Sequence, residues 1–129
     1  MAYKMTLDAA DVLTKEQFIN GLGNTECVEF VRQTSTAPHT TLWKKGALVI
    51  EMVPGTIPRG TVIATFDDRD RYPTDGKGKH AAIYLSHTKN SIEVLDQWKA
   101  QKRVLRRTIR VQIGNKRRSD LAQTFYIVE

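Results

Sequence analysis

Short segments rich in β-branched and aromatic residues follow one another from Ala47 to the C-terminus. These residue types favour strands, and glycine, proline or polar turns separate the segments. A turn at residues 86–90 joins two of them as a hairpin, which indicates antiparallel pairing. The predicted strands are 47–53, 61–66, 80–85, 91–98, 104–113 and 124–128, with turns at 54–55 and 58–60 between the first two.

Helical signals lie ahead of this β-rich part. Thr14 and Gln17 fit a capping box and Gly21 fits a helix stop, which predicts a first helix over residues 14–21. A second helix is predicted from about residue 24 to residue 34, and one further helical turn over residues 42–46. Helices followed by an antiparallel sheet predict the α+β class, with the N-terminal helices packed on the C-terminal sheet.

The single cysteine, Cys27, falls in the first turn of the second predicted helix. Asn24 or Thr25 is the expected N-cap residue, because its side chain accepts a hydrogen bond from an unpaired backbone N–H. A thiol at a helix N-terminus has a lowered pKa, and the thiolate is the nucleophilic form. The alternative is that Cys27 is a small buried core residue, and a nearby base is needed to favour catalysis.

His80 is the best candidate for that base. It starts a predicted core strand directly after the glycine-rich residues 75–79, whose spacing does not fit a phosphate-binding loop. Asp96 lies on the next strand, where hairpin pairing brings it next to His80 and lets it orient the imidazole. The alternative is a strand-end aspartate in a turn, or one paired with a nearby arginine. Other acidic or polar side chains that stay open as orienting residues are Glu93, Asn90 and His87.

The length of 129 residues and the ordinary globular composition predict one domain with a real core. A lone cysteine excludes an internal disulfide and leaves a Cys/His zinc site without partners, so no metal or cofactor is expected.

The net charge is +6, and much of the excess lies between Lys99 and Arg118. Such a surface favours polyanions, so a basic non-enzymatic module that binds nucleic acid or cell wall is the alternative function. Aromatic residues are not interleaved with the basic ones, which disfavours nucleic acid.

Four segments in this order resemble the small papain-like bacterial cysteine amidases. They are residues 27–31 with the cysteine, 60–66, 78–85 with Gly-Lys-His-Ala-Ala-Ile-Tyr-Leu, and 94–98 with Val-Leu-Asp-Gln-Trp. These amidases are the CHAP and NlpC kinds and their relatives, including peptidoglycan amidase effectors of type VI secretion systems. The resemblance covers about residues 24–98 and, more loosely, the two C-terminal strands. One departure is Glu26, an acid beside the cysteine where relatives often carry a neutral residue.

The resemblance implies a single papain-like amidase domain over residues 1–129 that hydrolyses an amide bond of the peptidoglycan stem peptide. Carried over by position, the nucleophile is Cys27, the base His80 and the orienting residue Asp96. Asn24 is the candidate second oxyanion donor, and Trp43, Tyr72 and Trp98 are candidate cleft walls. An amidase fold that only binds cell wall stays open as an alternative.

The same resemblance implies a small immunity protein as partner if the protein is a toxin. The N-terminus lacks the apolar segment of a secretory signal, and no apolar run is long enough to span a bilayer. We therefore expect synthesis in the cytoplasm and action in the periplasm or cell wall after specialised secretion or lysis.

Overall fold

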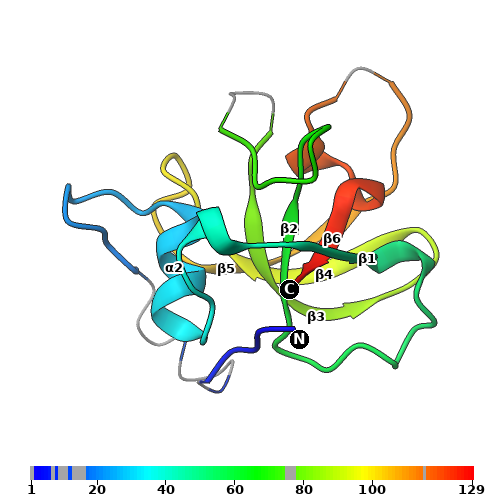
Figure 1. Ribbon diagram of the computed structural model, residues 1–129, viewed down its shortest axis with the longest axis horizontal. Coiled ribbons are helices and arrows are strands. Elements are labelled where there is room, and N and C mark those ends of the chain that lie inside the picture. The colour runs from blue at the N-terminus through cyan, green and yellow to red at the C-terminus, as the bar shows by residue number, and fades with distance from the viewer. Residues whose placement is uncertain (1, 7, 9–11, 13–16, 75–77, 115) are drawn as a thin grey trace.

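The computed structural model describes residues 2–6, 8, 12, 17–74, 78–114 and 116–129. Within them, helix α2 (Cys27–Thr34) precedes six strands that form one antiparallel sheet in the order β1-β6-β2-β3-β4-β5 (Figure 1). The architecture confirms the predicted α+β class. The strands are β1 (Lys45–Leu48), β2 (Val62–Thr65), β3 (Ala81–His87), β4 (Ser91–Asp96), β5 (Leu105–Arg110) and β6 (Phe125–Val128), and short 3-10 helices span Thr40–Leu42, Val49–Glu51, Arg118–Asp120 and Ala122–Thr124.

Strands β2 and β3 are buried on both faces of the sheet. Successive side chains of a strand point to opposite faces, and here they enter two separate apolar clusters. Ile83 and Leu85 pack in the cluster that contains Phe30 of α2, whereas Tyr84 packs in the cluster that contains Val49. Burial on both faces explains why these strands are continuous apolar runs in the sequence.

Helix α2 lies at one side of the sheet, against β3 and β4 (Figure 1). Its Phe30 and Val31 are fully buried, whereas Arg32 is exposed. The helix ends at Thr34 because the next residue, Ser35, has extended backbone and pairs with Met5 of the N-terminal segment. Among the helices of the described residues, none has the length and apolarity that a membrane crossing requires.

The hairpin between β3 and β4 is confirmed, and it brings the start of β3 beside the end of β4. The register pairs Ile83 with Leu95 and Tyr84 with Val94. The predicted segments 61–66, 91–98 and 124–128 also contain strands. The strand predicted over 104–113 ends at Arg110, and the apolar residues Val111 and Ile113 beyond it are exposed.

Two predictions near β1 are wrong. The strand predicted over 47–53 ends at Leu48, because the pairing of β1 with β6 shifts register and the chain then turns into the 3-10 helix Val49–Glu51. The helical turn predicted over 42–46 is also absent, since Lys45 and Gly46 belong to β1. A Cβ at Gly46 would lie 2.7 Å from the carbonyl oxygen of Ile127, so this glycine allows β1 to approach β6.

The helix predicted over 14–21 is not found where that range is described. Residues 17–20 are irregular, and residues 14–16 lie outside the described part. The physical reason is Gln97, whose buried side chain forms hydrogen bonds with both backbone groups of Phe18. The Phe18 N–H donates to Gln97 Oε1 at 3.2 Å, and Gln97 Nε2 donates to the Phe18 carbonyl at 2.7 Å. The same Nε2 donates to the Glu26 carbonyl at 2.9 Å, which ties the end of β4 to the start of α2.

Replacing Gln97 therefore has a predictable cost in stability. Gln97→Ala removes three hydrogen bonds and leaves buried backbone groups without partners, which lowers the free energy of unfolding by roughly 3 kcal/mol. Urea denaturation measures the change. The matched control is Gln33→Ala on the exposed side of α2, for which we expect a change of about 0.5 kcal/mol or less. Equal decreases in the free energy of unfolding for both variants would show that Gln97 does not tie the end of β4 to the start of α2.

Candidate active site

Cys27 is the first residue of α2 and is only 9% exposed. The N-cap residue is Glu26, which has extended backbone and makes no capping hydrogen bond with its side chain. The prediction of Asn24 or Thr25 as the cap is therefore wrong. Thr25 instead donates its hydroxyl to the Trp98 carbonyl at 3.3 Å, and the backbone of Asn24 bonds to Asn20. These contacts fix the helix start against the end of β4.

His80 and Asp96 are in contact, as the predicted hairpin requires. His80 Nε2 lies 2.7 Å from Asp96 Oδ2, with the two side chains 5% and 0% exposed. Arg107 of β5 completes the group by donating from Nε to both carboxylate oxygens, at 3.0 and 2.8 Å. Asp96 is thus paired with the imidazole and with a guanidinium at once. Two such partners compensate the burial of a carboxylate that is otherwise costly.

Backbone contacts place the His80 ring. Thr65 at the end of β2 accepts the His80 N–H on its hydroxyl at 3.1 Å and donates the same hydroxyl to the Gly78 carbonyl at 2.9 Å. Gly78 has φ near +101°, and a Cβ there would lie 2.6 Å from the backbone nitrogen of Arg118. Glycine is therefore required at this position of the glycine-rich segment, because it allows residues 117–119 to pack beside His80.

The electrostatics of Cys27 and His80 favour the charged forms of both. Burial raises the pKa of Cys27, but hydrogen bonding and charge from His80 outweigh it, helped by the Tyr72 hydroxyl and the Ala81 backbone, so the pKa falls below its usual 9.0. Burial lowers the pKa of His80, but Asp96 and Cys27 raise it to about 9. Because Nε2 faces Asp96, Nδ1 is the nitrogen left for the sulfur. The pair is thus suited to exist as thiolate and imidazolium.

Tyr72 contacts the sulfur, a role that its predicted place in a cleft wall did not indicate. Its hydroxyl lies 3.5 Å from Cys27 Sγ. Burial and the negative charge of an ionised Cys27 raise the pKa of Tyr72 well above 10, so the phenol stays protonated and is able to donate to a thiolate. Trp43 holds the ring in an edge-to-face contact, with centroids 5.0 Å apart. No local sequence signal indicates this contact, because Tyr72 lies in a polar loop far from Cys27 along the chain.

The other candidate orienting residues have different partners. Glu93 pairs with Arg106 on β5. His87 is buried at the other end of β3, where it contacts the Tyr84 hydroxyl at 2.6 Å and the Met52 carbonyl at 2.7 Å. Asn90 lies in the turn between β3 and β4. Of the predicted candidates, Asp96 is the one that touches His80, and it also has the arginine partner that the sequence offered as an alternative to this contact.

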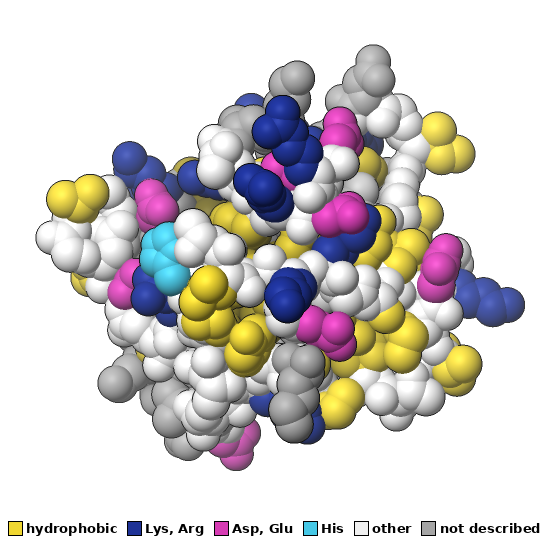
Figure 2. All heavy atoms as spheres, viewed as in Figure 1, with side chains coloured by type: hydrophobic (Ala, Val, Ile, Leu, Met, Phe, Trp, Pro, Cys, Tyr) yellow, Lys and Arg dark blue, Asp and Glu magenta, His cyan; other side chains and the backbone are white. Residues whose placement is uncertain are grey.

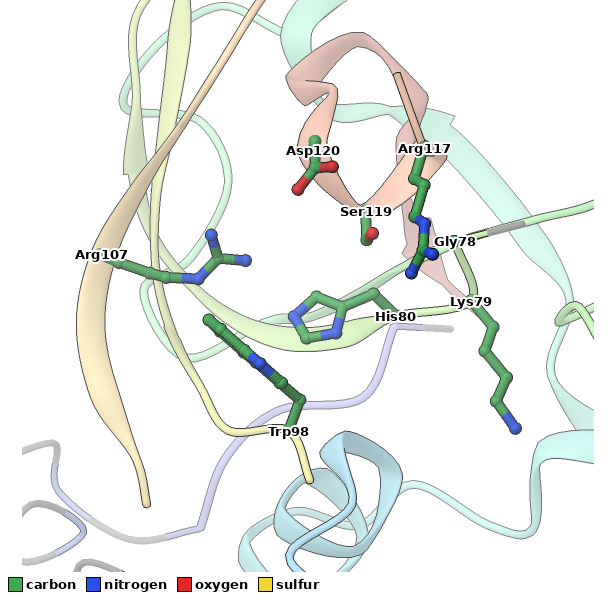
Figure 3. Close-up of a pocket in the computed structure, with 8 residues that line it drawn as sticks. All are labelled: Gly78, Lys79, His80, Trp98, Arg107, Arg117, Ser119 and Asp120. Atoms are coloured by element: carbon green, nitrogen blue, oxygen red, sulfur yellow. The ribbon is translucent and has the colours of Figure 1, made fainter. Parts of the chain in front are cut away.

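Two pockets flank the site, with Lys79 on the rim of both. The pocket on the His80 side has a volume of about 530 Å³, and Trp98 and Arg107 line it (Figure 3). The pocket on the other side, of about 640 Å³, is lined by Glu26, Trp43 and Tyr72 among others. All three predicted cleft aromatics therefore line a pocket. Figure 2 shows Lys and Arg side chains interspersed with acidic ones over the connection between β2 and β3.

The chain matches the family model described as domesticated amidase effector 2 over residues 5–128. It is 36% identical over 115 residues to the type VI secretion amidase effector 2 protein of Salmonella typhi, covering 81% of this chain and 84% of that protein. Among solved structures, it is similar to a type 6 secretion amidase effector 2 with a TM-score of 0.70 and 34% identity. That likeness covers 91% of this chain and 90% of the other.

The pairing of Cys27 with His80 predicts a specific pattern of thiol reactivity. In His80→Ala, burial is left as the largest influence on the thiol, so its pKa rises and alkylation by iodoacetamide at pH 7 slows by about tenfold or more. Raising the pH speeds the alkylation of this variant, because a larger fraction of the thiol then ionises without His80. Mass spectrometry of the alkylated protein measures the alkylation rate.

The matched control for this experiment is His39→Ala, since His39 is exposed and lies in the loop before the 3-10 helix Thr40–Leu42. That variant keeps the wild-type alkylation rate. If His80→Ala reacts as fast as the wild type at pH 7, the imidazole does not control the sulfur.

Proposed function

The chain belongs to the domesticated amidase effector 2 family, and on that premise we propose that it is a peptidoglycan amidase that uses Cys27 as its nucleophile. The observation that supports the proposal is the buried contact of His80 with Asp96, next to a cysteine whose pKa is lowered by hydrogen bonding and charge from His80. This combination supplies a nucleophile, a proton donor and an orienting group, which are the parts that acyl transfer needs.

In the acylation step, the Cys27 thiolate attacks the carbonyl carbon of the amide and forms a C–S bond. His80, held as imidazolium by Asp96, gives its Nδ1 proton to the leaving amine as the C–N bond breaks. Neutral His80 then takes a proton from water, whose oxygen attacks the thioester. The C–S bond breaks, and the thiolate–imidazolium pair is restored with a free carboxylic acid as the second product.

The negative oxygen of each tetrahedral intermediate needs hydrogen-bond donors. The backbone N–H of Cys27, at the first position of α2, is one such donor in this proposal, because N–H groups of a helix's first turn lack partners within the helix. Asn24 remains the candidate for the second donor. Its backbone N–H is already bonded to Asn20 Oδ1 at 3.0 Å, so the side-chain amide would have to donate.

Glu26 does not oppose the proposed chemistry, although an acid beside the nucleophile disfavours a thiolate in principle. Its side chain is exposed, and the forces that set the lowered pKa of Cys27 come from His80, Tyr72 and the Ala81 backbone. Solvent screens an exposed carboxylate more effectively than it screens the buried imidazole. Glu26 lines the second pocket.

The proposed substrate is a stem peptide of bacterial peptidoglycan, bound across the two pockets with its amide over Cys27. Relatives carry names of amidase effectors of type VI secretion, so we propose delivery to the cell wall by that route. A cognate immunity protein that blocks the cleft is part of the same proposal, since a toxin of this kind threatens the cell that makes it.

Digestion of purified cell wall tests the proposal. The wild-type protein releases new amine ends, whereas Cys27→Ala lowers the rate by about a thousandfold or more, because no other described side chain replaces the nucleophile. Asp96→Asn lowers it by about tenfold to a thousandfold, because His80 loses the charge that holds its proton. The matched control, Asp68→Asn, changes an exposed aspartate and keeps wild-type activity.

Equal release of amine ends by the wild type and by Cys27→Ala would remove the cysteine from the mechanism. Tight binding to cell wall with no release by the wild type would favour the alternative of a fold that only binds.

A further inference from the structure

From the pocket beside His80 we infer that the substrate carries a free carboxylate on the residue that supplies the leaving amine, and that Arg107 and Arg117 bind it. This inference rests on the proposed amidase function and adds a specificity to it. Among the described residues, three cationic side chains and one carboxylate line the pocket, besides His80 itself. The charged lining residues are Lys79, Arg107, Arg117 and Asp120.

Arg107 is fixed before any ligand arrives. Its Nε is bound to both oxygens of Asp96, and its guanidinium lies 4.7 Å from the centroid of the Trp98 ring. Within the described residues the hydrogen bonds of Arg107 all leave from Nε, so its two terminal nitrogens are left for another acceptor. Figure 3 shows this guanidinium reaching into the pocket beside His80. A planar guanidinium with free terminal N–H groups is suited to a carboxylate.

Arg117 enters the same pocket from the opposite side (Figure 3). The close packing of residues 117–119 against Gly78 sets its position, since a Cβ on Gly78 would lie 3.1 Å from Arg117 Cβ and 2.9 Å from Ser119 N. Lys79 points away from the pocket centre in the same view. Asp120 is exposed, and the cations outnumber it among the described lining residues, so these residues together favour an anion.

The position of the imidazole decides which side of the scissile bond occupies this pocket. His80 must reach the departing nitrogen to give it a proton, and His80 lines this pocket, whereas Tyr72 and Glu26 line the other. The residue that carries the amine therefore extends toward Arg107 and Arg117. A carboxylate bound there also contacts the guanidinium that holds Asp96, so substrate binding and imidazole orientation share one side chain.

The test uses two synthetic stem peptides that differ at one group. In one the residue supplying the leaving amine has a free carboxylate, and in the other that carboxylate is a primary amide. We expect the wild type to prefer the acid by about tenfold in kcat/KM, mostly through KM, because a charge-assisted bidentate contact is lost in the amide. In Arg117→Ala the preference falls to about twofold or less, and Arg117→Lys restores part of it. The matched control, Lys89→Ala in the turn between β3 and β4, keeps the full preference.

Binding of the same peptides to the Cys27→Ala protein, measured by calorimetry, separates the subsite from the reaction. If the Cys27→Ala protein binds the acid more tightly than the amide, and Cys27→Ala/Arg117→Ala does not, the subsite is supported. This conclusion holds even if the wild type cleaves neither peptide, a result that would count only against the proposed amidase activity. Equal cleavage and equal binding of acid and amide would overturn the subsite and leave the amidase proposal standing.

Discussion

The end of β4 holds both halves of the site through three consecutive residues. Asp96 binds the imidazole of His80, the next side chain, Gln97, binds the Glu26 carbonyl, and the Trp98 carbonyl accepts the Thr25 hydroxyl. Successive side chains of an extended chain point in opposite directions, so Asp96 reaches His80 beside β3 while Gln97 reaches the start of α2. The separation of sulfur and imidazole is therefore set by one short piece of backbone.

In the proposed site, four groups of alternating charge follow one another: the thiolate of Cys27, the imidazolium of His80, the carboxylate of Asp96 and the guanidinium of Arg107. Each buried charge in this row has a neighbour of opposite charge, which offsets the free-energy cost of burying His80 and Asp96. The row also explains part of the basic excess near the C-terminus. Arg107 and Arg106 on β5 are engaged by Asp96 and Glu93, so they act within the sheet as well as at its surface.

The sequence alone predicts Cys27, His80 and Asp96 as candidate site residues, but not the side chains that contact them. Alternation and a short turn predict the β3–β4 hairpin, and the hairpin places His80 beside Asp96. Tyr72 and Gln97 are not predicted because each contacts residues far away along the chain, and local patterns do not encode such contacts. Arg107 lies on the strand next to Asp96, and the sequence allows an arginine partner for Asp96 without identifying which one. The strand predicted over 47–53 fails for the same reason, since its end depends on pairing with β6.

Titration of the His80 imidazole by NMR tests the central claim most directly, because the claim is that its neighbours hold it charged. In the wild-type protein we predict a midpoint near pH 9, since Asp96 and Cys27 outweigh the effect of burial. The midpoint falls in Asp96→Asn, where one of the two anions is gone. A wild-type midpoint at or below the usual 6.5 would contradict the account, because the imidazole would then be neutral where the thiolate needs it charged.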